Sequence, residues 1–459
     1  MSGNGRVSPG ANPCMLRPTV AMQPTQTIEL PWGAQTLSVP LPAGWRVLGR
    51  LEPRRMDAPA DVPVACARAL ADPIEAVPLQ HRDLADCRVV IVTDDHSRPT
   101  PVAELLPAVL DALVQGGARD EKIEILLANG VHRASRPEEV ERKLGRDVMA
   151  CFRWRCHDAH DDASLADLGT TSRGTHVLVN RLLVDADLIV CVGAVEPHLL
   201  LGFGGGLKMI VPGCAGNETI GRNHMQGVDP DNFDFVGADI STMRLDLEQA
   251  AGLLNKEVFI VNAVMNAEGR PTRFFCGDAV EAQRAGAAFL RDIVGLPVSR
   301  QADVVLTNSH PMDADLRQSA KCLGNTLYAC RPGGVMLGCV RCEHGLGEMP
   351  IPKRTLPYPL LRLLLKVIGK ERVLPLVKRI KQGEPVEEIF VGHFGLQMLR
   401  RNHLALFSDI LPPDTGKKVG LARTYDDLGQ MLQWAARRVP ADASVWVFPF
   451  GGATYATLS

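Results

Sequence analysis

The sequence predicts an α/β fold built as two α/β domains with mostly parallel sheets and an active site in the cleft between them. Continuous apolar runs alternate with stretches of helical periodicity, as in parallel strands that helices cover on both faces. The chain also has 459 residues, more than one ordinary hydrophobic core holds. We expect an N-terminal domain at residues 26–296 and a C-terminal domain at 297–459, divided near Pro297. As an alternative, roughly the last 30 residues return to the first domain.

The first series opens with a hairpin at residues 27–42, in which two alternating runs meet at Trp32-Gly33. Four apolar runs then predict strands at residues 88–95, 122–130, 185–194 and 257–266. Three segments with helical spacing predict helices at residues 103–117, 136–145 and 279–295. Gly116-Gly117 ends the first of these helices and Pro137 begins the second, in agreement with the preferences of helix ends.

The second series begins near residue 300. Strands are expected at residues 302–309, 333–340 and 444–452, and helices at 314–330, 358–380 and 425–438. Residues 358–380 carry Gly369 and Pro375, so we expect breaks in that helix near both positions.

The composition excludes several classes of partner. The net charge is −2 and aromatic residues make up 5%, so we expect neither a nucleic-acid partner nor an acidic membrane partner. No apolar segment reaches the length of a membrane span. Several of the 12 cysteines lie in apolar runs, which is typical of reduced, buried thiols and predicts a cytoplasmic protein. Cys339 and Cys342 form the single CxxC and are expected to be strand-packed thiols.

The first 25 residues are rich in Gly and Pro, lack the apolar core of a signal peptide, and are expected to be disordered. Met15 and Met22 are alternative starts for the chain.

Polar side chains, most of them ionisable, follow four of the predicted strands. They are Asp94, Asp95, His96 and Arg98 after the first strand, His132 and Arg133 after the second, His198 and then Lys208 after the third, and Gln318 and Lys321 behind residues 302–309. In open parallel sheets, ligands bind beyond the carboxyl ends of the strands. The sequence therefore predicts that these side chains meet at one edge and form an active site.

Each of these residues also has a structural interpretation. Asp95 and its neighbour could cap a helix or a turn, and Arg98 could form a surface ion pair or hold a carboxylate or phosphate. His132 fits a loop histidine with satisfied hydrogen bonds as well as a catalytic one. The position of His198 before a glycine-rich loop favours function. His224, taken alone, is typical of an exposed histidine at a helix end.

The stretch "EPHLLLGFGGGLKMIVPG" carries four closely spaced glycines before Lys208. It is not a Walker A loop, because Leu207 and Met209 flank the lysine where Gly and Ser or Thr are needed. The third glycine of a dinucleotide fingerprint is also missing. Glycines without a Cβ let the backbone approach a bulky ligand, and the lysine could bind phosphate or form a covalent link. The resulting hypothesis is that this loop binds a nucleotide-like ligand.

Five motifs in this order resemble the nickel-dependent lactate racemase family of 2-hydroxyacid racemases and epimerases. "DDHSRPTP" resembles an Asp-x-Thr-Arg-Pro segment, and "GVHR" a Gly-x-His-Arg segment. "EPHLLLGFGGGLKMIVPG" resembles Glu-Pro-His followed by a Gly-Phe-Ser-Gly-Gly-x-Lys loop. "NH" at Asn223-His224 and "RQSAK" at residues 317–321 match in kind and spacing. The resemblance extends from about Arg88 to Lys321.

This resemblance implies a nickel-pincer nucleotide, a pyridinium mononucleotide with two sulfur-containing arms and a nickel–carbon bond. Its pyridinium-3-thioamide-5-thiocarboxylic acid would be attached covalently at Lys208, with Gly204, Gly205 and Gly206 close to it. His224 would be the protein ligand to nickel, which accepts imidazole and sulfur. Separate proteins would have to make the cofactor.

The resemblance also implies a reaction. It is inversion at C2 of a small 2-hydroxy acid by hydride transfer to the cofactor, through a 2-keto acid. His132 and His198 would be acid and base, with similar pKa values near neutrality. Arg98 and Lys321 would hold the substrate carboxylate, and Asp95 and Gln318 would orient substrate or neighbouring groups.

The sequence departs from the family pattern at Gly204, where the family has serine. No aromatic substrate contact can be aligned in the C-terminal part, although Trp434 and Trp446 are available. The substrate and the oligomeric state are therefore left open. Three other hypotheses remain, namely a metal-dependent hydrolase, a non-catalytic protein that binds the cofactor, and, ranked last, a nicotinamide dehydrogenase. The hydrolase would use His132, His198 and His224 on zinc, but the sequence lacks an HExxH pair.

Overall fold

The structure is a computed structural model that describes residues 24–227, 236–238, 240–347, 349, 351–352, 355–381 and 386–458. Residues 1–23 of the N-terminal segment that we expected to be disordered lie outside the described residues, and Pro24 already begins strand β1.

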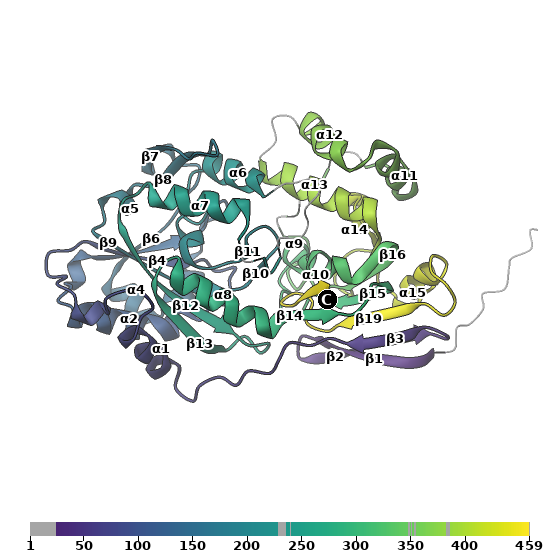
Figure 1. Cartoon of the computed structure of the whole chain (residues 1–459), viewed down its shortest axis with the longest axis horizontal. Helices are drawn as coiled ribbons and strands as arrows, with labels where there is room; N and C mark the ends of the chain where they lie inside the picture. The colour runs from purple at the N-terminus through teal and green to yellow at the C-terminus, as the bar shows by residue number, and fades with distance from the viewer. Residues whose placement is uncertain are drawn as a thin grey trace, which may run out of the picture.

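Two six-stranded sheets form the framework of the molecule, and they lie side by side along its long axis (Figure 1). The first sheet has the order β13 (Pro271–Asp278), β12 (Glu257–Met265), β9 (Leu188–Val195), β4 (Val89–Asp94), β5 (Ile123–Ala128) and β6 (Arg153–Cys156). All its neighbours pair in parallel except β12 and β13, which are antiparallel. The α/β class with mostly parallel sheets is therefore confirmed.

The second sheet is parallel throughout. Its order is β18 (Arg423–Tyr425), β17 (His403–Phe407), β16 (Cys330–Cys339), β15 (Ala302–Asn308), β19 (Ser444–Phe448) and β3 (Arg46–Arg50). Figure 1 shows β3 next to β19, so a strand from the start of the chain completes a sheet built mainly from its end. The domain boundary near Pro297 stays a prediction.

The described residues also form four two-stranded pairs outside the two large sheets. They are β1 (Pro24–Trp32) with β2 (Gln35–Pro42), β7 (Leu165–Thr170) with β8 (His176–Asn180), β10 (Pro197–His198) with β11 (Gly202–Phe203), and β14 (Gly295–Val298) with β20 (Tyr455–Leu458). The expected hairpin at residues 27–42 is thus confirmed as β1 and β2.

The helices of the first series are α1 (Val62–Ala71), α2 (Val102–Gln115), α3 (Pro137–Leu144), α4 (Arg146–Cys151), α5 (Arg181–Asp185), α6 (Asn217–Gln226), α7 (Thr242–Gly252) and α8 (Glu281–Val294). Those of the second are α9 (Leu316–Ser319), α10 (Lys321–Asn325), α11 (Tyr358–Ile368), α12 (Val373–Ile380), α13 (Val386–Arg401), α14 (Thr415–Val419) and α15 (Leu428–Ala436). No helix in the described ranges is both long and apolar enough to cross a bilayer.

Burial on both faces explains why the strands are continuous apolar runs. In β4, Val89 and Ile91 pack into one hydrophobic cluster, while Val90, which points to the opposite face, packs into another. Cys339 and Cys342 are both buried free thiols, but only Cys339 lies in a strand, since Cys342 follows the end of β16. Every cysteine in the described part of the chain is free.

Two helix predictions need correction. The expected helix at 314–330 is divided into α9, α10 and a short 3-10 turn at Leu327–Ala329, with Ala320 between the two helices. The break expected at Gly369 is present, because this residue has a φ of 78° that favours glycine. The second break, near Pro375, is wrong, since Pro375 lies in the first turn of α12, where the missing N–H costs no helical hydrogen bond.

Candidate active site

One cavity of about 300 Å³ collects side chains from the ends of β4, β5 and β9 together with others from the second series. The predicted site residues that line it are Asp95, Arg98, His132, His198, Gly205, Lys208, His224, Gln318 and Lys321. Gly204 and Gly206 belong to the same loop but are not among the described lining residues. Strands β4, β5 and β9 are parallel neighbours, so their carboxyl ends lie at one edge, as the sequence predicted.

His132 is held by Asp95. Its Nδ1 lies 2.7 Å from Asp95 Oδ2, and Asp95 also accepts hydrogen bonds from the backbone N–H and hydroxyl of Ser97, at 3.0 and 2.6 Å. Although burial opposes ionisation, the hydrogen bonds from His132 and Ser97 lower the pKa of Asp95. An ionised carboxylate only accepts, so Nδ1 of His132 carries the proton and Nε2 carries the lone pair.

The neighbouring Asp94 has different partners. It contacts the Lys143 ammonium and accepts a hydrogen bond from the Thr100 hydroxyl at 2.5 Å. Burial raises its pKa, while Lys143 opposes that effect. The two adjacent aspartates thus serve separate partners, and of the two only Asp95 contacts a histidine.

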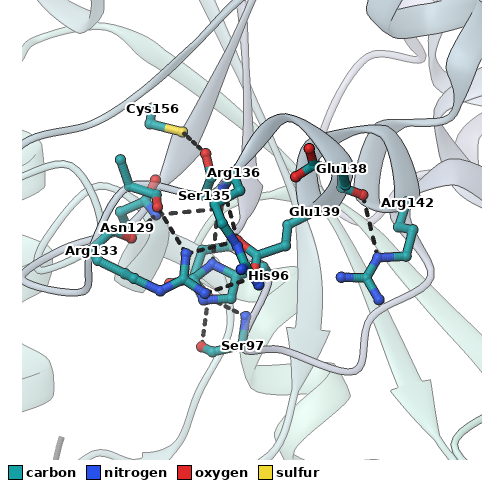
Figure 2. A network of polar contacts seen from close by, with 12 residues as sticks. His96, Ser97, Asn129, Arg133, Ser135, Arg136, Glu138, Glu139, Arg142 and Cys156 are labelled. Atoms are coloured by element: carbon teal, nitrogen blue, oxygen red, sulfur yellow. Dashed lines mark hydrogen bonds and ion pairs between the residues drawn. The ribbon is translucent and has the colours of Figure 1, made fainter.

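The loop that carries His132 is fixed to the start of α3 by Glu139 (Figure 2). Glu139 accepts hydrogen bonds from both terminal nitrogens of Arg133, at 2.7 and 2.6 Å, and from the backbone N–H of Arg136, at 2.8 Å. Hydrogen bonds from Arg133 and Arg136 keep the pKa of Glu139 below its usual range. His96 belongs to this network, since its Nδ1 lies 2.9 Å from the Ser135 hydroxyl.

Glu196 stands at the centre of the cationic part of the cavity, although the sequence analysis assigned it no role. Its Oε1 accepts a hydrogen bond from Arg98 at 2.9 Å and lies 3.7 Å from Lys208 Nζ. Burial raises the pKa of Glu196, but Arg98, Lys208 and Lys321 outweigh it and lower the pKa to about 2. Arg98 is therefore paired with a carboxylate of the protein itself. The Glu-Pro pair at the end of β9 was the available signal.

Two buried lysines share this environment. Burial, reinforced by the charge of Arg98, lowers the pKa of Lys208 to about 7 and that of Lys321 to about 8. At neutral pH a sizeable share of Lys208 is therefore a neutral amine, which is the nucleophilic form. Lys321 is the first residue of α10, and Gln318 lies in α9, whose first turn is capped by Asp315.

His198 has the opposite hydrogen-bonding pattern from His132. Its Nδ1 accepts from the backbone N–H groups of Leu200 and Leu201, both at 3.2 Å, so in the neutral ring Nε2 carries the proton. Burial, Lys208 and Lys321 keep its pKa well below the usual value. The expected pKa near neutrality is therefore not found for His198, because cations lie close to its ring. An anionic ligand beside these lysines would reverse part of the effect.

Buried side chains hold the glycine-rich loop by its carbonyl groups. The Arg244 guanidinium donates to the carbonyls of Phe203, Gly204 and Gly205, and the amide of Gln283 donates to Gly204 O at 3.1 Å. Gly205 has a φ of +76°, and a Cβ there would lie 3.1 Å from the carbonyl oxygen of Ala194. The loop is therefore a fixed piece of backbone that only glycine can form at this position.

His224 lies near the end of α6 and lines the same cavity. Its Nδ1 lies 2.7 Å from the carbonyl oxygen of Ile220, which can only accept, so the proton is on Nδ1 and the lone pair on Nε2. The ring packs edge-on against Phe390 of α13, with centroids 6.2 Å apart. A histidine fixed in this way is typical of metal ligands.

The C-terminal side of the cavity comes largely from α13, which the sequence analysis did not predict. Its Phe390 and Phe394 line the cavity. Neither Trp434 nor Trp446 is among the described lining residues. Trp434 packs against Tyr358, while the Trp446 indole donates to the carbonyl of Arg300.

The described residues form no group of three or more His, Cys, Asp or Glu side chains that could hold a metal ion. A structural or catalytic zinc site uses at least three such ligands. The three histidines therefore do not form the hydrolase site that was considered as an alternative, and any metal here would take most of its ligands from another group.

Comparisons with known proteins point to one family. A family model described as the lactate racemase N-terminal domain matches residues 32–233. The chain is 31% identical over 327 residues to the lactate racemase of Thermoanaerobacterium thermosaccharolyticum, which covers 70% of this chain and 75% of the relative. It is 27% identical over 397 residues to the lactate racemase of Lactiplantibacillus plantarum, covering 84% and 88%.

A solved structure, that of the lactate racemase apoprotein from Thermoanaerobacterium thermosaccharolyticum, matches with a TM-score of 0.80 at 26% identity. It covers 94% of this chain and 100% of that chain. These relatives are named as racemases, which are isomerases, so the expected enzyme class is confirmed. With its sequence relatives and its fold in agreement, this chain belongs to the lactate racemase family.

Proposed function

We propose that the protein is a racemase or epimerase that inverts C2 of a 2-hydroxy acid with the help of a nickel-pincer nucleotide attached at Lys208. The observation that carries the proposal is the pair of histidines with opposite tautomers on one cavity with Lys208. His132 exposes a lone pair on Nε2 and His198 a proton on Nε2. Inverting a stereocentre requires that a base take the hydroxyl proton of either enantiomer, and a single base does not provide this for both.

The residues present fit the cofactor. Gly205 presents backbone to the cavity where a Cβ would be crowded, and Lys208 offers a partly neutral amine beside it. Such an amine can form a thioamide with a thiocarboxylic acid, with loss of water. His224 would add one imidazole ligand through Nε2, and the sulfur arms of the cofactor would supply others. When bound, the cofactor would supply a reversible hydride acceptor for the C2 hydrogen of the substrate.

The side chains of the protein would handle the proton and the carboxylate. For one enantiomer, His132 Nε2 would take the hydroxyl proton, while Asp95 keeps the ring oriented and stabilises the positive charge. His198 would take the mirror role for the other enantiomer in its second tautomer, in which Nδ1 has released the Leu200 and Leu201 N–H groups and carries the proton, so that the Nε2 lone pair accepts the hydroxyl proton. Lys321 would bind the substrate carboxylate, and Arg98, shared with Glu196, would be the second cation. Gln318 would orient the substrate.

The test uses protein produced together with the proteins that make the cofactor. Nickel content, the mass of the peptide that carries Lys208, and racemisation of a panel of 2-hydroxy acids are measured on the same preparation. We expect nickel near one per chain, an adduct on Lys208 and racemisation. His132→Ala and His198→Ala should each keep nickel and lose racemisation by about 100-fold or more. His160→Ala, at an exposed loop position outside the cavity, is the control.

The outcomes separate the remaining hypotheses. Loaded enzyme that racemises none of the acids would favour a protein that only binds the cofactor. Racemisation by protein with neither nickel nor adduct would exclude the proposed cofactor. Full racemisation by both histidine variants would exclude their assigned roles.

A further inference from the structure

We infer that the preferred substrate is a 2-hydroxy acid with a bulky apolar side chain, such as 2-hydroxy-4-methylpentanoate, rather than one with a methyl group, a second carboxylate or further hydroxyls. This inference rests on the proposed function and concerns the same cavity. It is based on one part of the cavity lining, here called the wall, which is formed by α13, β17 and the segment before β18.

This wall is apolar throughout. From position 390 to position 422, each lining residue that the structure describes is apolar or glycine, and the larger ones include Phe394, Met398, Leu404, Leu406 and Leu421. A polar substrate group directed to this wall would lose its water and find no side-chain partner there. Malate-like and sugar-acid substrates are therefore disfavoured.

The apolar wall begins directly beside the expected carboxylate site. Lys321 and Leu323 both belong to α10 and both line the cavity, so a cation and an apolar side chain lie on the same short helix. A Cβ on Gly324 would lie 2.9 Å from Phe394 and 3.0 Å from Leu199, the residue that follows His198. A substrate bound by its carboxylate at Lys321 would thus have an apolar surface within reach of its C2 substituent.

The metal end of the cavity adjoins this wall, because the Phe390 ring contacts that of Phe394, with centroids 5.9 Å apart. Phe390 packs against the ring of His224, so we assign it to the cofactor side. Leu406 and Leu421 come from β17 and the segment before β18, elements that contribute no titratable lining residue among those described. Leu421 in turn packs over Gly395, where a Cβ would meet it at 2.4 Å. The wall is therefore a packed surface of α13 and the second sheet, ready to contact an apolar chain.

The test compares kcat/KM of the loaded enzyme for 2-hydroxy-4-methylpentanoate, lactate and malate. Each added methylene that is buried against an apolar wall favours binding, so we expect at least about a tenfold preference for the larger acid over lactate. Malate should be the poorest of the three. Equal or better turnover of lactate or malate would overturn the inference and leave the proposed function intact, whereas no racemisation of any acid would overturn the proposed function.

A variant of a wall residue tests whether the wall causes the preference for the larger acid. Ala422→Leu adds three carbons to the lining, and we expect the ratio of kcat/KM for 2-hydroxy-4-methylpentanoate over lactate to fall about tenfold. The same substitution at Ala67, on the exposed side of α1 and outside the cavity, should leave the ratio unchanged. An unchanged ratio in Ala422→Leu would contradict the assignment of the wall.

If Ala422→Leu does not fold, competition on the wild-type enzyme gives the same information. 4-Methylpentanoate, which lacks the reacting hydroxyl, should inhibit at about a tenfold lower concentration than propanoate. Equal inhibition by the two acids would overturn the inference.

Discussion

At the scale of single residues, the site is defined by which nitrogen of each histidine carries the proton. His132 donates from Nδ1 to Asp95, while His198 accepts two backbone N–H groups at Nδ1. A carboxylate partner orients a histidine and stabilises its charged form, whereas backbone donors keep it neutral. The two rings therefore differ before any ligand binds.

Replacing Asp95 tests this difference. Asp95→Asn can present an N–H to His132 and so favour the tautomer of His132 with the lone pair on Nδ1. In that tautomer Nε2 carries the proton, and the lone pair points away from the reacting atoms. We expect kcat of the loaded enzyme to fall about 100-fold or more with little change in nickel content. The pH profile of kcat should change with it, because the ring loses its anionic partner. Unchanged kcat would show that Asp95 has no orienting role.

At the scale of elements, the ends of strands and the loops after them bring the functional groups together. The loop after β5 carries His132 and is fixed to α3 through Glu139, which is 5% exposed in its side chain and accepts from Arg133 and Arg136. Glu139 does not touch the cavity, so we assign it a positioning role.

Glu139→Gln is expected to weaken these charge-assisted hydrogen bonds and to lower the free energy of unfolding by about 1–3 kcal/mol. The kcat should fall more than KM rises, since the His132 loop loses its anchor while the cationic site stays in place. Glu138→Gln, one residue earlier on the exposed side of α3, is the matched control and should change neither property. A loss of stability in Glu139→Gln with unchanged kcat and pH profile would restrict Glu139 to a structural role.

The sequence predicted the main strands because their residues are buried on both faces, and it predicted the polar residues at their ends. It did not predict α13, since its apolar residues serve both the second sheet and the cavity, and Gly392 and Gly395 interrupt the pattern. It also gave no role to Glu196. The partner of this residue, Arg98, is 98 positions away, and such long-range pairs have no local signature.

At the scale of the whole molecule, the cavity concentrates charge at a cost in stability. Lys208 has its pKa lowered from 10.5 to about 7, first by burial. Between these two values the unfolded chain binds a proton that the folded protein does not, so the stability of the protein without cofactor rises with pH through this window. Below about pH 7, Lys208 is protonated in both the folded and the unfolded state. The free-energy cost of burying its charge is then fully present.

Lys208→Met tests this penalty in the protein without cofactor. The variant should unfold at a higher temperature than the wild type near pH 6, and the difference should shrink as the pH approaches 10. A gain of 1 kcal/mol corresponds to a shift of about 1 °C for a chain of 459 residues that unfolds in one step. Lys417→Met, at an exposed position of α14, should behave like the wild type at every pH. A difference independent of pH would contradict the assigned pKa.

The central claim, that C2 is inverted by moving its hydrogen to the cofactor and back, is tested most directly by following deuterium. One enantiomer of the fastest 2-hydroxy acid, labelled with deuterium at C2, is racemised by the loaded enzyme in ordinary water. Hydride transfer predicts that both enantiomers of the product keep deuterium at C2, because the hydrogen never exchanges with solvent. Loss of deuterium to water at the rate of racemisation would show proton abstraction at C2 instead and contradict the claim.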